Sequence, residues 1–398
     1  MTHKHGFYNQ YSGKKADKKL KKNNNCYHDS ILEIEEEKIK FKRALSTSIS
    51  KSLNSERETL KNTLQEKYNC LLAWNAHYDY DLWNMVEKHF NFLWLELEPE
   101  MYLGVEYCLY EEVRNLFLEL RNFFQWTGRI KERIYFAAWL KREAERRQDT
   151  GIIYLGISSL VWSYTSSGCY QDLEKAYKLW DKLAFDVFPI DSPIRCDKLC
   201  KNIKDSFGSC LYAELLIEVH ESGVRLAVRK SEFDKAFVRI EKGKNTIDEL
   251  FKQELITRRL KERFTLAFNY HKGIVFHLMQ EYREAEKLFR SISERAEYIG
   301  WNRVIKGAKS WLATLAMVNQ DYSKCKNILE DISSKNSRPL FDKRDGFCYL
   351  IKSQVLSKEG RKEQAEESQK NAIRIFKKCS KNNWECTLNS FILLSSEK

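Results

Sequence analysis

Small residues recur at a fixed interval in the C-terminal half of the chain. Three of them lie 40 residues apart, in the segments EYREAEKLF, DYSKCKNIL and RKEQAEESQ: Ala285, Cys325 and Ala365. Twelve residues before each lies another small residue: Gly273, Ala313 and Ser353. Two helices approach each other closely only where the facing positions carry almost no side chain. The interval therefore predicts a series of packed helix pairs.

Larger apolar residues keep the same register around these small positions. Phe289 and Leu329 lie four residues after the first two small residues, and Phe276, Ala316 and Leu356 lie between the paired small positions. The third unit departs from the pattern, because Gln369 stands where the others have a large apolar residue. We expect this unit either to pack differently or to begin a polar capping surface, as terminal repeats require.

The scarcity of turn-forming residues supports a helical fold. The 398 residues include only 4 prolines and 15 glycines, against roughly 20 and 28 at average usage. Short strands joined by hairpins each need their own Gly, Asn or Pro, so the composition predicts an all-α fold. Prolines interrupt helices, and we expect a loop at each of the four: Pro99, Pro189, Pro193 and Pro339.

The C-terminal pattern resembles the tetratricopeptide repeat (TPR), which pairs two helices in each unit. Gly273, Phe276, Ala285 and Phe289 match the family's small and aromatic positions at its own spacing. The interval of 40 exceeds the family's ~34, so each unit would have longer helices or loops. The resemblance implies a TPR-like α-α superhelix of helix-turn-helix repeats, preceded by an N-terminal helical region. It covers about 122–379, strongly over 264–375.

Four regions follow from these patterns. Residues 1–29 form a basic tail of low apolar content, for which we expect disorder. Residues 30–121 form the N-terminal helical region, and 122–262 hold degenerate repeats with a loop near 185–207. The degenerate units are Gly128–Ala137, Gly168–Tyr177 and Ser231–Ile240, the last with Ala236 in the small position. Residues 263–398 hold the clear repeats and a C-terminal helix.

Two N-terminal patterns indicate packed helices. Leu53, Leu60, Leu64 and Leu71 follow helical spacing, which predicts a packing helix rather than a long coiled coil. The aromatic residues between 68 and 125 also recur at helical spacing, which favours a hydrophobic core over a ligand cage.

The longest uncharged stretch, Gly151–Gly168, contains five serines and is too polar for a membrane span, so we expect a helix packed between helices. No apolar run lies near the start of the sequence, and no secretory signal is expected. The cysteines number 11 and are scattered, which indicates reduced thiols and a cytoplasmic protein.

The resemblance also implies a function. Family members bind a partner protein segment in a concave groove lined by the first helix of each repeat, without catalysis. Carried over to this sequence, the groove positions are Tyr270, Ile274, His277, Ser310, Thr314 and Gln354, together with Met317, Leu350 and Ser357. Tyr270 and Ile274 stand where the family's carboxylate clamp has Lys and Asn, so recognition of chaperone tails is not expected. An alternative is that several of these side chains pack between repeats.

The sequence gives little support for enzyme activity or for a metal site. Gly151-x4-Gly156 is followed by Ile157 rather than Lys, so no P-loop is present. Cys196, Cys200, Cys210 and His220 lack the usual Cys-x2-Cys spacing of zinc sites, and we expect free thiols there. We therefore expect no enzyme activity and no cofactor.

Nucleic-acid binding remains an alternative. The net charge is +12, of which +5 lies in residues 1–29. The tail lysines that could contact phosphates are Lys14, Lys15, Lys18, Lys19, Lys21 and Lys22. A second basic cluster comprises Lys141, Arg142, Arg146 and Arg147. Because the rest of the chain is only mildly basic, a protein partner is favoured over nucleic acid. A regulatory role and any oligomeric state stay open.

Overall fold

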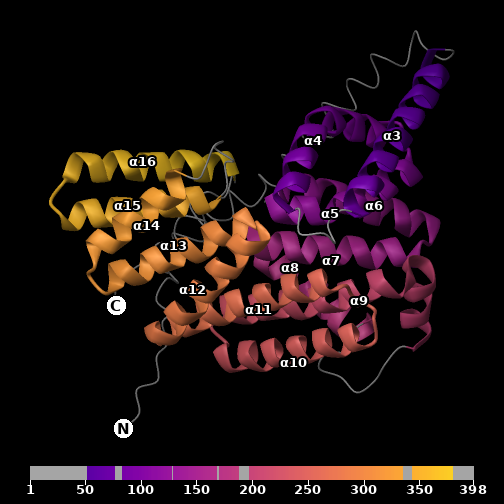
Figure 1. The fold of residues 1–398 in the computed structure, drawn as a ribbon. Coiled ribbons are helices and arrows are strands. Elements are labelled where there is room, and N and C mark those ends of the chain that lie inside the picture. Colours follow the sequence, from indigo (N-terminus) through magenta and orange to yellow (C-terminus); the bar gives the residue numbers. More distant parts are fainter. Residues whose placement is uncertain are drawn as a thin grey trace, which may run out of the picture. The chain divides into compact units, whose positions relative to one another are not determined.

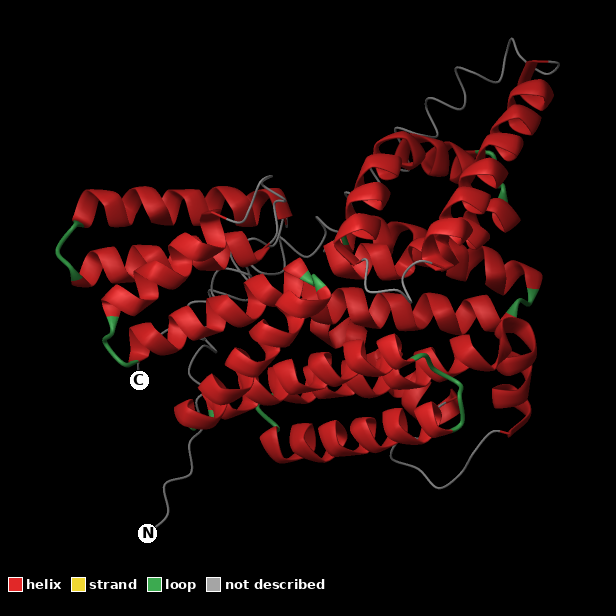
Figure 2. Ribbon diagram, viewed as in Figure 1, coloured by secondary structure: helices red, strands yellow, loops and turns green. Residues whose placement is uncertain are grey.

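A computed structural model describes residues 52–76, 83–127, 129–167, 170–187, 197–334 and 343–379. Within these ranges the protein is all-α, with helices joined by short turns and no strand (Figures 1 and 2). The helices are α3 (Ser52–Ala76), α4 (Trp83–Glu106), α5 (Tyr110–Thr127), α6 (Ile130–Arg147), α7 (Thr150–Ser167), α8 (Tyr170–Lys182), the π-helix η2 (Leu183–Val187), α9 (Asp197–Arg229), α10 (Phe233–Lys252), α11 (Arg258–Leu278), α12 (Tyr282–Ile299), α13 (Asn302–Val318), α14 (Tyr322–Ser334), α15 (Lys343–Lys358) and α16 (Lys362–Cys379).

The chain divides into two compact units, Met1–Thr59 and Leu60–Lys398. Of the first unit the described part is the start of α3, where the Thr59 hydroxyl donates to the Ser55 carbonyl at 2.9 Å. All the other helices belong to the second unit.

Helices of the second unit pack mainly on their neighbours in sequence. From α9 onward they form antiparallel pairs, α9/α10, α11/α12, α13/α14 and α15/α16. We call the odd-numbered helices from α7 to α15 the first helices and the even-numbered ones from α8 to α16 the second helices. First helices also contact one another, α7 with α9, α9 with α11, and α13 with α15. This sequential packing is that of an α-α repeat array, as expected.

The turns within the pairs share one backbone geometry. Gln280, Gln320 and Gly360, again 40 residues apart, all adopt positive φ values, of 66°, 59° and 78°. The amide after each donates to the carbonyl five residues earlier, at 2.8–2.9 Å, which satisfies a carbonyl left free at the helix end. Ser231, with φ of 59°, does the same between α9 and α10. The repeat is therefore one of turn geometry as well as of sequence.

The small residues lie where the paired helices meet, as predicted. A Cβ added at Gly273 would lie 2.9 Å from ring atoms of Phe289 on the facing helix. Ala285, Ala313 and Cys325 are all buried. In the third pair the Ser353 hydroxyl of α15 donates to the Ala365 carbonyl of α16 at 2.8 Å, so the small side chain contacts the backbone of the facing helix directly. Ala236 is likewise buried.

Gln369 is exposed, and the third pair does pack differently at this position. The adjacent Ser368 is buried instead and donates to the Tyr349 carbonyl at 2.9 Å. A hydroxyl-to-backbone hydrogen bond thus replaces the apolar contact of the earlier repeats.

The uncharged stretch forms α7, which packs against α6, α8 and α9 as expected. Most of its apolar residues are buried, and so are Ser158, Ser159 and Ser163, of which the last two are fully enclosed. The Ser163 hydroxyl donates to the Ser159 carbonyl at 2.7 Å, which satisfies the hydroxyl within its own helix. In the part of the chain that is described, no helix is long and apolar enough to cross a membrane.

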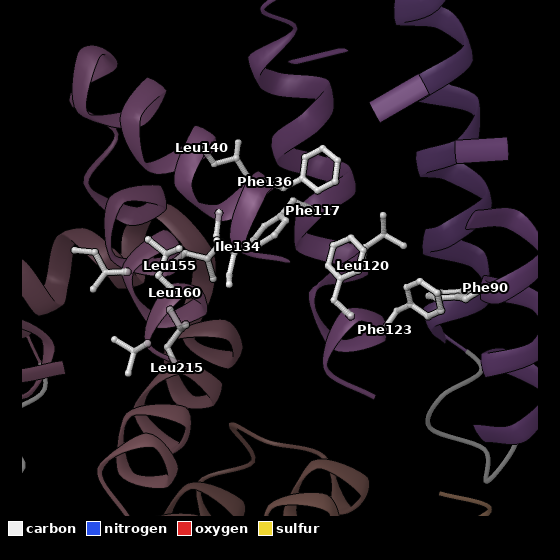
Figure 3. Close-up of a cluster of buried hydrophobic side chains, with 14 of the residues drawn as sticks. Phe90, Phe117, Leu120, Phe123, Ile134, Phe136, Leu140, Leu155, Leu160 and Leu215 are labelled. Carbon is white, nitrogen blue, oxygen red and sulfur yellow. The ribbon is translucent and has the colours of Figure 1, made fainter. Parts of the chain in front are cut away.

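Most of the described N-terminal aromatic residues form a core, as predicted, whereas Phe92 is 67% exposed. Trp94 on α4 packs edge-to-face on Phe124 of α5 and on Phe136 of α6, with ring centroids 5.0 and 6.4 Å apart. The core continues through Leu120 and Leu155 to Leu215 on α9 (Figure 3). Leu60, Leu64 and Leu71 of α3 are also buried in it, so α3 is a packing helix.

The loop predicted at Pro99 is wrong. Pro99 lies inside α4, where its ring removes one amide hydrogen and displaces the carbonyl four residues earlier. That residue is Leu95, which is 69% exposed. Because the affected turn lies on the exposed face of the helix, water can satisfy the freed carbonyl. The other three prolines lie outside the described residues.

The break predicted near 185–207 lies partly outside the described residues. Of this range, residues 185–187 lie in η2 and residues 197–207 lie in α9, so the described part is helical rather than a loop. The kink in α9 comes just after the range, at Gly208, whose φ of 78° is non-helical. The region boundaries at 121/122 and 262/263 stay predictions.

Candidate functional site

The predicted groove residues lie on α11, α13 and α15. Tyr270 of α11 is half-buried, and its hydroxyl accepts a hydrogen bond from Trp311 Nε1 of α13 at 3.0 Å. Its ring meets Phe289 edge-to-face at 5.8 Å, and Phe289 stacks on Trp311. Tyr270 therefore joins two successive repeats while keeping part of its surface open.

Three of the predicted residues are enclosed by the helices. Ser310 and Thr314 are 1% and 0% exposed, and their hydroxyls donate to carbonyls of their own helix at 2.7 and 2.9 Å. His277 is buried against Trp311, with ring centroids 5.0 Å apart. In this conformation these side chains have almost no surface with which to contact a partner.

Ile274 and Gln354 are half-buried, like Tyr270, and Ser357 is exposed. Met317 and Leu350 are buried. The predicted groove thus divides into side chains that face between repeats and side chains with open surface. The part played by the open ones in partner binding stays a prediction.

A cluster of buried charges lies among α5, α6, α9 and α11, and its members are not among the predicted site residues. We call it the inner charge cluster; its members are Arg121, Arg133, Glu214, Glu218 and Arg263. Each of these residues is at most 6% exposed. Charges are almost never fully buried unless they are paired, so the contacts among these five residues determine what the cluster can do.

Glu214 is the best-paired acid of the cluster. It accepts hydrogen bonds from the guanidinium groups of Arg121 and Arg263, the latter at 3.2 Å. Arg263 also donates to Asn122 Oδ1 and Gln125 Oε1, at 2.9 and 2.8 Å. Burial alone would raise the pKa of Glu214, but the two arginines lower it below its ordinary value.

Glu218 has no close guanidinium. Its carboxylate oxygens lie 3.8, 3.9 and 4.0 Å from the nearest nitrogens of Arg121, Arg133 and Arg263. The Ser158 hydroxyl of α7 donates to it at 3.2 Å. Glu218 therefore attracts all three cations but is not hydrogen-bonded by any of them.

A second buried group continues along the same face of α9. Arg225 donates to Glu221 Oε1 at 2.6 Å and to Ser166 Oγ at 2.7 Å. It also donates to His271 Nε2 at 3.1 Å. Burial lowers the pKa of His271. Burial works against ionisation of Glu221, but the Arg225 guanidinium holds the pKa of Glu221 well below its ordinary value.

The sequence does contain a signal for this face of α9. Glu214, Glu218, Glu221 and Arg225 are spaced by four, three and four residues, which puts them on one side of a helix. Their neighbours in the segment LYAELLIEVHESGVRLAVR are largely apolar. A charged stripe within an apolar helix indicates buried ion pairs rather than a solvated face.

Of the two predicted basic segments, the structure describes only the one on α6. The six tail lysines lie outside the described residues. On α6, Lys141 pairs with Glu145 at 2.5 Å and Arg146 pairs with Glu143 at 2.7 Å. The Arg147 guanidinium lies 4.6 Å from the ring centroid of Tyr110. Much of the α6 charge is thus engaged within the protein, which lowers its availability to phosphates.

The cysteine-rich segment is only partly described. Cys210 is exposed, and His220 is buried with its Nε2 3.3 Å from the Thr246 hydroxyl. Cys196 and the side chain of Cys200 lie outside the description. Within the described ranges, no group of three His, Cys, Asp or Glu side chains is arranged to hold a metal ion.

Comparison with known proteins gives no family. No family model matches the chain, and no curated protein matches it. Among solved structures, BtubC (BKLC) from P. vanneervenii aligns over 62% of this chain and 90% of its own, with 18% sequence identity and a TM-score of 0.39. A likeness at this level carries no argument about function.

Proposed function

We propose that this protein is a non-catalytic interaction scaffold of the TPR type, which binds a segment of a partner protein along its first helices. The observation that carries the proposal is the repeated helix pair. Its positive-φ turn recurs every 40 residues, at Gln280, Gln320 and Gly360. Its close helix contact is present at both Gly273 and Ser353. Stacked helix pairs create an extended, preformed surface, which lowers the entropy cost of binding a peptide segment.

The open side chains of α11 and α15 are the candidates for contact. Tyr270, Ile274 and Gln354 combine an aromatic ring, an aliphatic group and an amide. An amphipathic aromatic residue together with apolar and amide groups suits recognition of a protein segment. The proposal needs neither a cofactor nor a reacting group. It places the protein in the cytoplasm, in keeping with its scattered thiols.

The experiment is affinity purification with mass spectrometry on three forms of the full chain. These are the wild type, the double variant Tyr270→Ala/Gln354→Ala, and Tyr298→Ala as a matched control. Tyr298 is 71% exposed on the second helix α12, so the control removes a tyrosine from the other layer of the array. Circular dichroism checks that each form is folded.

We expect one partner to be retained by the wild type and by Tyr298→Ala, and to be depleted at least tenfold on the double variant. Equal retention by all three forms would refute binding along α11 and α15. Release of the partner by nuclease, or by deletion of residues 1–29, would instead favour nucleic-acid binding through the basic tail.

A further inference from the structure

One face of α4 is both apolar and exposed. Phe92, Leu95, Pro99 and Leu103 are spaced by three, four and four residues, which puts them on the same side of the helix. Phe92 and Leu95 are 67% and 69% exposed, Leu103 is 42% exposed, and Pro99 is exposed as well. We call these four residues the α4 stripe. It spans about 17 Å along the helix, at 1.5 Å per residue.

The fold does not need the α4 stripe to hold the helix in place. The opposite side of α4 packs on the core, with Phe90 against Phe123 of α5 and Trp94 against Phe124 (Figure 3). Single apolar side chains on a surface need no explanation, but a continuous row of large ones marks an interaction surface. The charges beside the stripe indicate what kind of partner it fits.

Acidic side chains line the margin of the stripe toward α3. Lys67 of α3 pairs with Glu96 at 2.5 Å and also lies near Glu100, so one cation serves two carboxylates. Burial raises the pKa of Glu100 above its ordinary value, and its Oε2 atom has no hydrogen-bond partner among the described residues. This margin therefore carries more carboxylate than cation.

The margin toward α6 has the same imbalance. Glu98 lies near Glu132 of α6, and Arg129 lies near both. Burial raises the pKa of Glu98, and repulsion from Glu132 raises it further. A cation supplied from outside relieves this repulsion. An anionic lipid surface, or the same face of a second copy of the chain, would increase it.

Pro99 adds a hydrogen-bond acceptor to the stripe. Because proline has no amide hydrogen, the Leu95 carbonyl loses the donor that a regular helix would supply. Leu95 is one of the most exposed residues of the stripe. Lys and Arg side chains carry donors and no acceptor, so a basic partner satisfies this carbonyl as well as the carboxylates.

We propose that the α4 stripe binds an amphipathic helix of another protein, whose apolar face is flanked by Lys and Arg residues. The apolar side chains of this helix cover the stripe, and its cations pair with the carboxylates on the two margins. Burial of apolar surface supplies most of the affinity, and the charges supply specificity. This surface shares no residue with the first helices α11 and α15, so the protein can use both.

The test uses a designed probe of known chemistry. The probe is a fluorescein-labelled peptide of about 18 residues, or five helical turns, with leucines at helical spacing and lysines on both sides of them. Its matched control carries glutamate in place of every lysine. Fluorescence anisotropy measures the binding of each peptide to the full chain. We expect a micromolar Kd for the lysine peptide and binding about tenfold weaker for the glutamate peptide; equal affinities would overturn the proposal.

Variants of the full chain locate the binding surface. Phe92→Ser/Leu95→Ser removes the apolar contact, and Val238→Ser is the matched control, since Val238 is 55% exposed on α10. The double variant should bind the lysine peptide about tenfold more weakly, and the control should bind it as the wild type does. Glu96→Gln/Glu98→Gln should weaken binding and reduce its dependence on salt. Equal binding by the wild type and Phe92→Ser/Leu95→Ser would overturn the proposal.

Two other occupants of the stripe give different results. If sedimentation velocity shows a dimer that Phe92→Ser/Leu95→Ser abolishes, the stripe binds a second copy of the chain and the proposal is wrong. Binding to phosphatidylserine vesicles that the same variant abolishes would assign the stripe to a membrane surface, and would also overturn it. A monomer that binds the lysine peptide and not the vesicles supports the proposal.

Discussion

Replacing Glu214 by Gln tests how far the inner charge cluster holds the array together. The substitution keeps the shape of the side chain and removes its charge, so the expected loss of stability does not include the cost of a cavity. Arg121 and Arg263 lose their hydrogen-bonded carboxylate, and Glu218 is left with three cations at 3.8–4.0 Å. Removing one partner of a buried ion pair costs about 3–5 kcal/mol, a large share of a total stability of about 5–15 kcal/mol.

Urea denaturation followed by circular dichroism measures this loss. With an m-value of about 3 kcal/mol/M for a chain of this size, the midpoint should fall by about 1–1.7 M. The control is Glu145→Gln, which breaks the surface pair with Lys141 on α6 and should cost less than about 1 kcal/mol. A loss of stability at Glu214 no larger than at Glu145 would show that the buried ion pairs of Glu214 do not hold the array together.

The same variant has a distinct pH profile. The pKa of Glu214 is lower in the folded protein than in the unfolded chain. Its contribution to stability is therefore fully present above the unfolded value of about 4.3, and it is lost as the pH falls through the folded value. Glu214→Gln should show a weaker dependence of stability on pH below this value. If the stability of the variant falls with decreasing pH as steeply as that of the wild type, the ionised pairing of Glu214 would be contradicted.

Three further predictions concern the repeats. Gly273→Val places a branched side chain against the buried Phe289 ring and should cost about 1–3 kcal/mol by overpacking; an unchanged urea midpoint would contradict the close approach. Gln320→Val puts a β-branched residue at a φ of 59° and should cost about 1–2 kcal/mol, whereas Gln320→Gly should cost nothing; equal stability of the two variants would contradict the turn geometry. Burial raises the pKa of the Cys325 thiol to about 12, so iodoacetamide at pH 8 should alkylate the exposed Cys210 well before Cys325, as mass spectrometry of tryptic peptides would show.

The repeat was predictable because its physical requirement is visible in single residues. Close approach of two helices demands small side chains at a fixed separation, and Gly273, Ala313 and Ser353 meet that demand at equal intervals. The packed character of α7 was predictable for a similar reason, since serines within an uncharged stretch fit helix contacts better than lipid.

The inner charge cluster was not predictable from composition, because Arg, Glu and Lys are most often solvated. Arg121, Arg133 and Arg263 come from three helices, and nothing local in the sequence shows that they converge. Only the spacing of Glu214, Glu218 and Glu221 within an apolar segment points to burial. Pro99 was misjudged because its effect on a helix depends on whether the affected turn faces water, which depends on tertiary packing.

Hydrogen exchange on the protein bound to its partner tests whether the first helices form the binding surface. We expect a partner captured by the full chain to slow exchange in peptides from the first helices α11 (Arg258–Leu278) and α15 (Lys343–Lys358), with little change in α12 or α16. Protection confined to the second helices, or to residues 1–29, would contradict binding along the first helices.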